Sequence, residues 1–378
     1  MSILEALPSR QRKYPLLREA RFDDYDQIAA VQTANRLTVK PRKEWLHLWQ
    51  GNPAYRRLPH WPIGWVLEDQ EARIVGSLEN VPCFYRFRRR DFVGAFGRGW
   101  AADPQYRAYS LLLLFRQLQQ PGVDLRVTNT ANPRTSAVLS QQGWLRIPAG
   151  KWDRSALWVA SYTQILQDYL APKAPSVLSS ALGRLWRPSF LMKDLLSAPG
   201  MKFRNGPELR WCTQFDERFE QFWVDLGERN PDVLLADRSQ PALEWHYKDA
   251  LAQNRLWILT ASDRQRLIAY AIFEQKEARL VDLPKLVLVD YQSLSNAGEL
   301  GTLIISCALK RCRKAFVPVL ENPGCWLEAL HPGAKRASFR RKFGGWSYLY
   351  HASNPELSDA LRAPESWYPT QYDADASL

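Results

Sequence analysis

The chain has 378 residues, of which 46% are hydrophobic and 24% are charged, a composition typical of globular rather than disordered proteins. Its net charge of +12 favours an acidic partner, such as a phosphorylated cofactor, a nucleic acid or an anionic membrane, without choosing among them. Met1 to Tyr14 lack the apolar stretch of a signal peptide, and apolar runs such as Leu111 to Phe115 are too short to span a bilayer. We therefore expect a cytoplasmic protein without a transmembrane segment.

Cysteine and histidine are used sparingly. The five cysteines are an odd number without a C-x-x-C pair, and the five histidines are scattered without a His-Glu-x-x-His motif. A disulfide framework and a metal site are therefore not expected, and buried reduced thiols are the simplest interpretation.

Four landmarks of the first half recur in the same order in the second half. They are an apolar-basic pair before an acidic turn, a Glu-Trp pair, a Trp-led hairpin and a Gly-Trp pair. The matching residues are Leu17-Arg18 and Leu209-Arg210, Glu44-Trp45 and Glu244-Trp245, Trp65 and Trp257, and Gly143-Trp144 and Gly345-Trp346. We predict two tandem domains of one fold, at residues 1–170 and 208–378.

The segment between them, residues 171–207, contains five prolines and two basic amphipathic stretches, Val177 to Trp186 and Phe190 to Leu196. We predict a partly helical linker packed between the domains. Peripheral contact with a membrane surface is the alternative for the two stretches.

The first half alternates strand and helix patterns. A strand at 14–21 precedes a helix capped by Asp23 or Asp24, whose apolar face contains Ile28 and Val31. The further elements expected in chain order are a helix at 42–49, a hairpin of 64–68 with 73–81, strand material at 84–102 around the basic run 86–90, a helix at 110–120 and a strand at 123–129. Strand, turn, helix and strand at the end of this series form a βαβ-like unit.

The turn before the helix at 110–120 is the most plausible place for chemistry. A helix N-terminus presents unpaired backbone N–H groups and a partial positive charge, so it can hold a phosphate. Arg107 adds a permanent cation to this turn.

These features resemble the GNAT superfamily of acyl-coenzyme A dependent N-acyltransferases. The family's cofactor loop reads Arg or Gln, two residues, Gly, one residue, then Gly or Ala. Arg107 fits the first position, while Ser110 and Leu112 replace the glycines; Asn132 and Gly143-Trp144 match the family's downstream landmarks. The resemblance implies an α/β (α+β) fold in each half, a mixed, mostly antiparallel sheet flanked by helices.

The resemblance also implies roles for individual residues. The donor, acetyl-coenzyme A or another acyl-coenzyme A, would contact Trp100, Ala101, Ala102, Arg107, Ala108, Tyr109, Ser110, Leu111 and Asn132. Glu79 is the candidate base and Tyr109 the candidate acid, because the family's usual tyrosine corresponds to Leu139. The alternatives are an ordinary exposed strand carboxylate for Glu79 and a plain surface cation for Arg107. The acceptor would be an amine of a small molecule, a sugar or a peptide.

The second half resembles the family more faintly. A strand at 285–291 and a helix at 300–314 are expected, but 292–298 lacks the cofactor-loop pattern, so we expect this copy not to bind coenzyme A in the usual manner. Such pairs also resemble Fem-type transferases, which take an aminoacyl group from tRNA. A non-catalytic scaffold is the third hypothesis.

The basic stretch Arg336 to Lys342 is the best sequence support for a tRNA donor, because cations next to Phe339 and Phe343 can contact a nucleic-acid backbone. The preferred interpretation is a basic helix with both phenylalanines facing the core.

Overall fold

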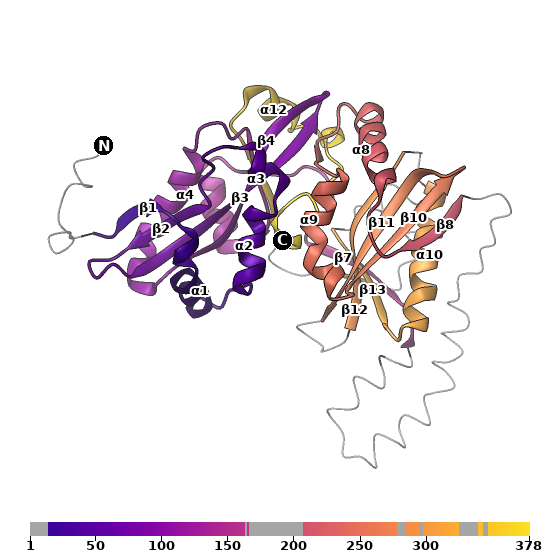
Figure 1. The fold of residues 1–378 in the computed structure, drawn as a ribbon, viewed down its shortest axis with the longest axis horizontal. Helices are drawn as coiled ribbons and strands as arrows, with labels where there is room; N and C mark the ends of the chain where they lie inside the picture. Colours follow the sequence, from indigo (N-terminus) through magenta and orange to yellow (C-terminus); the bar gives the residue numbers. More distant parts are fainter. Residues whose placement is uncertain are drawn as a thin grey trace, which may run out of the picture.

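The computed structural model describes residues 14–162, 165, 207–277, 284–294, 298–324, 339–342 and 347–378. They form two mixed sheets that lie side by side, each flanked by helices (Figure 1). Residues 171–206 of the predicted linker at 171–207, which include the stretches at 177–186 and 190–196, lie outside the described residues. No helix in the described part is both long and apolar enough to cross a bilayer.

The first sheet consists mainly of strands from the first half. Its order is β1 (Leu16–Glu19), β2 (Gly64–Glu68), β3 (Ile74–Phe87), β4 (Arg90–Ala102), β5 (Leu125–Ala131), β15 (Ser347–Ala352) and β6 (Leu145–Arg146), with β9 (Leu235–Ala236) paired to β3. The described helices of this half are α1 (Tyr25–Ala34), α2 (Arg42–Gln50), α3 (Pro53–Arg57), α4 (Ser110–Leu118) and α5 (Pro133–Gln141).

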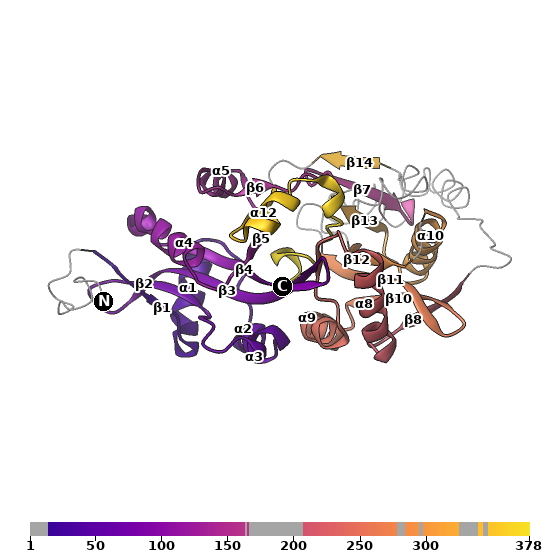
Figure 2. The same ribbon diagram turned by 90° about the horizontal axis from the view of Figure 1, so that it is seen from above.

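The second sheet repeats this plan. Its order is β14 (Phe339–Lys342), β7 (Arg154–Val159), β13 (Val319–Pro323), β12 (Pro284–Ser293), β11 (Arg266–Glu277), β10 (Leu256–Asp263) and β8 (Glu208–Cys212). The described helices beside it are α8 (Glu217–Arg229), α9 (Gln240–Ala252) and α10 (Gly298–Lys314). A further helix of the second half, α12 (Pro355–Ala360), lies near the first sheet. Figure 2 shows α2, α3, α9 and α8 along one side of the two sheets. The predicted pair of mixed, mostly antiparallel sheets flanked by helices is confirmed.

The two sheets exchange strands. β7 follows β6 in the chain but pairs with β13 of the second sheet, whereas β15 returns from the second half to pair with β5 and β6 of the first. The division into domains at 1–170 and 208–378 stays a prediction, but each sheet contains a strand from the other half. The halves therefore share backbone hydrogen bonds as well as side-chain packing.

Two expectations about local structure are wrong. Asp24 precedes α1 but makes no side-chain cap to α1 itself; its carboxylate accepts from the Arg18 guanidinium at 2.7 and 3.0 Å and from the Arg21 N–H at 2.7 Å, at the start of the preceding 3-10 turn Phe22–Asp24. Phe339–Lys342 is a strand that pairs with β7, not part of a helix. A four-residue basic and aromatic stretch fits either period, and the free edge of β7 decides in favour of the strand.

The C-terminal segment 364–378 lies between the two sheets and is anchored by a buried ion cluster. Arg238, which follows β9, donates from Nε and Nη2 to the Asp290 carboxylate on β12 at 3.0 and 3.1 Å, and its Nη2 lies 2.8 Å from Asp373 Oδ1. Thr370 joins both carboxylates through Oγ1, at 3.0 Å from Asp290 and 2.9 Å from Asp373. Because a buried charge without a partner is costly, these residues hold the segment in one position.

Arg238→Met tests this anchor. The variant leaves Asp290 and Asp373 buried without their cation, so we expect the free energy of unfolding to drop by roughly 3–5 kcal/mol. Urea unfolding monitored by circular dichroism measures it. Lys248→Met, on the exposed side of α9, is the control and should change stability by less than about 0.5 kcal/mol. Equal stability of the two variants would contradict the anchoring role.

Candidate functional site

The parallel strands β4 and β5 separate soon after they pair. Their register contains only Gly94 with Leu125 and Ala95 with Arg126, although β4 continues to Ala102 and β5 to Ala131. Beyond Ala95, the edge of β4 that faces β5 has no strand partner among the described strands. Backbone N–H and C=O groups at such an edge require another partner, which an extended ligand with amide groups could supply.

A cavity of about 510 Å³ opens at this divergence. Its walls come from β4, β5, α4, α5, the loop after α1 and the C-terminal segment. The volume is within the range of small-molecule sites, roughly 300–1,000 Å³. Its position between two diverging strands makes it the best candidate site in the described part of the chain.

A bulge in β4 shapes the cavity wall. Ser77 pairs with Ala101 and Glu79 with Arg98, so Gly99 and Trp100 together lie opposite Leu78. Gly99 has a φ of +60°, and a Cβ there would lie 2.1 Å from Gln32 Nε2, so glycine suits both the backbone and the space. Trp100 Nε1 donates to the Ser110 carbonyl at 3.0 Å, which ties β4 to the start of α4.

Arg126 fixes the other end of α4. It is buried, and its guanidinium donates to the carbonyls of Gln117 (2.7 and 3.0 Å) and Gln120 (3.2 Å). These carbonyls lie at and just beyond the C-terminal end of α4, where the helix dipole favours a cation. The Gln117 carbonyl also accepts from the Gln120 N–H at 3.2 Å. Burial lowers the pKa of Arg126 to about 10, so it stays charged at neutral pH. Helix α4 is thereby held at both ends beside the cavity.

Two of the residues expected to bind the cofactor line the cavity, Trp100 and Asn132. Asn132 also caps α5 by accepting from the Thr135 N–H at 3.0 Å. The other residues of that set lie outside the lining: Ala101 and Ala102 are buried in β4 and the remaining five are at the start of α4, namely Arg107, Ala108, Tyr109, Ser110 and Leu111.

The turn before α4 is a 3-10 helix, Pro104–Tyr109, continuous with α4. The Ser110 N–H therefore bonds to the Arg107 carbonyl and is not free for a ligand. Arg107 is exposed, and Tyr109 contacts Tyr14, with ring centroids 6.0 Å apart. The roles of these residues stay a prediction.

Glu79 is not the exposed carboxylate considered as the alternative; it is 4% exposed. Its Oε1 accepts from Gln32 Nε2 and Trp45 Nε1, both at 2.8 Å, and its Oε2 accepts from Arg98 at 3.2 Å. All three donors hold the carboxylate, and Glu79 is not among the residues that line the cavity. Its evident effect is to join α1, α2 and β4.

Asp375, in the C-terminal segment, is the carboxylic acid that sequence reasoning missed. It lines the cavity, and its carboxylate accepts from the Asn129 N–H at 2.8 Å and from the Thr130 hydroxyl. Burial raises the pKa of Asp375, and the Thr130 hydrogen bond opposes this shift. An isolated aspartate 245 residues from its partner has no local pattern that could have revealed it.

The corresponding opening in the second sheet is filled. β12 and β13 pair in parallel over residues 285–287 and 319–321. Two residues further along β12, the Val289 carbonyl accepts from the Tyr372 N–H at 3.3 Å, and Thr370 binds the adjacent Asp290. The C-terminal segment thus occupies the edge of β12 beyond its pairing with β13. The corresponding edge of β4, at Gly97, borders the open cavity instead.

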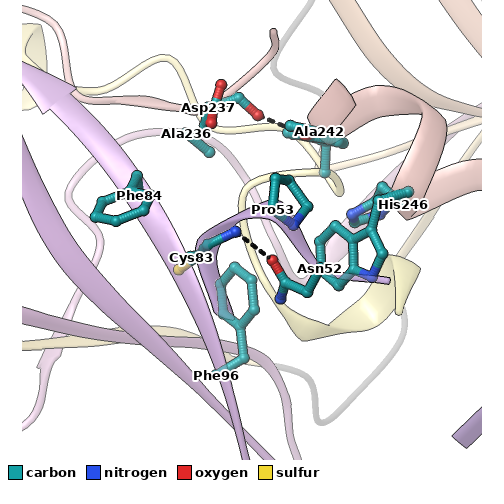
Figure 3. A pocket seen from close by; sticks show the side chains of 12 residues that line it. Asn52, Pro53, Cys83, Phe84, Phe96, Ala236, Asp237, Ala242 and His246 are labelled. Atoms are coloured by element: carbon teal, nitrogen blue, oxygen red, sulfur yellow. Dashed lines mark hydrogen bonds between the residues drawn. The ribbon is translucent and has the colours of Figure 1, made fainter. Parts of the chain in front are cut away.

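A second, much smaller cavity of about 20 Å³ lies between α3, β3, β4, α9 and the C-terminal segment (Figure 3). It has room for a single water molecule. At its wall, His246 Nε2 lies 2.9 Å from Ser377 Oγ, and the imidazole packs on the Tyr372 ring at 4.5 Å. Burial, followed by nearby cations that include Lys40, lowers the pKa of His246 to about 3.

Metal chemistry has no obvious site in the described ranges. They contain no cluster of three or more His, Cys, Asp or Glu side chains that could hold an ion. Cys83, Cys212, Cys307 and Cys312 are free thiols, and Cys325 lies outside the described residues.

Comparison with solved structures identifies the fold. The chain matches a probable N-acyltransferase from Enterococcus faecalis with TM-score 0.54 and 12% identity, over 90% of this chain and 73% of that one. It matches a GCN5-related N-acetyltransferase from Anabaena variabilis with TM-score 0.52 and 13% identity, over 89% and 72%. Saccharomyces cerevisiae N-myristoyltransferase with bound myristoyl-CoA gives TM-score 0.50 and 10% identity, over 92% and 85%. The protein therefore has the GNAT fold that the sequence resemblance implied.

Comparison of sequences adds nothing to this assignment. No family model matches the chain, and no curated protein matches it.

The pH dependence of stability tests the lowered pKa of the partly buried His246. Below about pH 6.5 the unfolded chain takes up a proton that the folded protein does not accept until pH falls to its pKa of about 3. The unfolding free energy is expected to decrease as pH falls through this window, by up to about 1.4 kcal/mol per pH unit. His246→Gln removes this contribution, so its stability should depend less on pH.

Urea unfolding of both proteins at about pH 7 and about pH 5 measures the difference. Asp373 and Asp375 titrate in both proteins, so subtraction isolates His246. Parallel pH dependences of wild type and variant would show that the folded protein can accept this proton.

Proposed function

We propose that this protein is an acyl-coenzyme A dependent N-acyltransferase whose donor and acceptor meet in the cavity between β4 and β5. The observation that carries the proposal is the divergence of these strands on a GNAT fold, with an unpartnered backbone edge facing a cavity of about 510 Å³. The filled opening beside β12 supports a single donor site in the first half.

The donor would lie along β4. Its pantetheine arm carries amide groups, which match the free N–H and C=O groups of β4 beyond Ala95 as an added strand would. The bulge at Gly99 and Trp100 would place a backbone N–H near the thioester carbonyl, where it stabilises the oxyanion. The phosphates would lie toward the start of α4, where Arg107 supplies an exposed cation that can bind phosphate.

Asp375 is the proposed base. Among the described side chains that line the cavity it is the one carboxylic acid, and burial raises its pKa toward the range in which a base works well near neutral pH. It would accept a proton from the acceptor ammonium, directly or through one water. The neutral amine then attacks the thioester carbon and the C–N bond forms. As the C–S bond breaks, the nitrogen gives up its second proton to the coenzyme A thiolate, and Asp375 releases the first proton to solvent.

The cofactor assignment is tested by Arg107→Ala with Arg116→Ala as its control. Both arginines are exposed, one before α4 and one on its outer surface. Loss of a charge-assisted contact to phosphate should raise the Kd for acetyl-coenzyme A by about tenfold in the first variant. Arg116→Ala should bind as wild type does. Titration calorimetry at fixed salt measures both, because a cationic protein also attracts polyanions nonspecifically.

Saturable binding that is equally strong in both variants would remove Arg107 from the site and leave the cavity assignment intact. Absence of saturable binding by folded wild-type protein would contradict the proposed function and shift attention to aminoacyl-tRNA or a scaffold.

Asp375→Asn tests the base. The amide can still accept from the Asn129 N–H, so the C-terminal segment should stay in place and the Kd for acyl-coenzyme A should not change. We expect kcat to fall by about 10²–10⁴. Asp359→Asn, an exposed carboxylate at the end of α12, should keep wild-type kcat. Wild-type kcat in Asp375→Asn would assign proton transfer to another group.

A further inference from the structure

We propose that the acceptor is an amine that also carries an anionic group, a carboxylate or a phosphate, which is bound by the loop after α1. This inference rests on the proposed acyltransferase function and specifies its substrate class. It follows from the charges that surround the cavity and from the side of the sheet on which they lie.

The described side chains of the cavity wall are predominantly cationic. Arg36, Lys40 and Arg98 line it, opposed by the single carboxylic acid of Asp375. Arg98 is neutralised by Glu79 at 3.2 Å. Neither Arg36 nor Lys40 has an ion-pair partner among the described residues, so two positive charges are left on one wall.

Glu79 cannot compensate these charges, because Gln32, Trp45 and Arg98 already use both of its oxygens. Asp375 is held by Asn129 and Thr130 on β5. Glu44, Asp249 and Glu274 lie near enough to Lys40 to oppose the lowering of its pKa, but none of them forms an ion pair with it in the described part of the chain. A direct ion-pair position on this loop is therefore open to an anionic ligand.

Lys40 is the stronger of the two anchors. Its side chain is partly buried, and burial, followed by the nearby Arg98, lowers its pKa. A desolvated ammonium beside a second cation is stabilised by any anion that binds there. Arg36 is exposed and would contribute less.

The loop and the expected phosphate site lie on opposite faces of the first sheet. α1 packs through Ile28 and Val31 into the core that contains Val66 and Ile74. α4 packs through Leu113 with Trp65 and Leu67, whose side chains alternate to the other face. Figure 2 shows α1 and α4 on the two sides of the sheet. Donor phosphates at the start of α4 would therefore leave Arg36 and Lys40 free for the acceptor.

The experiment compares matched amines with acetyl-coenzyme A as donor. Glucosamine 6-phosphate is paired with glucosamine, and L-glutamate with L-glutamate dimethyl ester, so the first pair tests a phosphate and the second a carboxylate. Release of free coenzyme A thiol gives kcat/KM. We expect the anionic member of one pair to be favoured by about tenfold or more, the value of one charged hydrogen bond.

Lys40→Met should abolish this preference while the Kd for acetyl-coenzyme A stays unchanged. Lys43→Met, an exposed lysine in the first turn of α2, is the matched control and should keep it. Equal kcat/KM for both members of both pairs would overturn the inference and leave the acyltransferase function standing. Failure to bind acetyl-coenzyme A at all would overturn both.

If none of the four amines reacts, binding of inorganic phosphate to the acetyl-coenzyme A complex decides the matter. Saturable binding that weakens by about tenfold in Lys40→Met, but not in Lys43→Met, would support the site. Binding that is absent, or equal in both variants, would overturn it.

Discussion

The ion cluster of Arg238, Asp290 and Asp373 is the interaction on which the arrangement of the molecule depends. It joins the segment after β9, the centre of β12 and the C-terminal segment in a region without solvent. Since none of its three charges can be left unpaired cheaply, the C-terminal segment is held against β12. From this anchor Tyr372 contacts Val289 in the second sheet, and Asp375 reaches β5 in the first. One segment thus fills one strand opening and completes the wall of the other.

The exchange of strands also ties the two halves of the chain together. β15 supplies the neighbour of β5 from a distant part of the chain, and β7 supplies the neighbour of β13. Contacts such as the hydrogen bond from the Tyr85 hydroxyl to the Asp373 carbonyl, 2.6 Å across 288 residues, carry the entropic cost of closing long loops. The cavity that we propose as the active site is therefore a product of the whole chain, although its diverging strands belong to the first half. The two sheets share one strand plan, and the C-terminal segment fills the opening in the second sheet but only borders the one in the first.

Local patterns were sufficient for most of the elements but not for the site. The hairpin of β2 and β3, the helices after Pro41 and Tyr109, and the repeated landmarks around Trp65 and Trp257 follow from alternation, capping residues and turns, so they could be predicted. The exchange of β7 and β15 could not be predicted, because the two strands have similar hydrophobic patterns and either could pair in either sheet. Asp375 and Lys40 become neighbours of one cavity only through the tertiary fold. Glu79 has the pattern of an exposed strand residue, and only the donors of Gln32, Trp45 and Arg98 explain its burial.

The central claim is that an acyl-coenzyme A occupies the opening between β4 and β5 and not its filled counterpart. Hydrogen–deuterium exchange of the full-length protein with and without acetyl-coenzyme A tests it most directly, because an added backbone partner slows exchange of the amides it binds. We predict protection in residues 97–102 of β4 and 128–131 of β5, with 288–293 of β12 unchanged. Protection confined to 288–293 and 319–323, or none in either sheet at saturating ligand, would contradict the account.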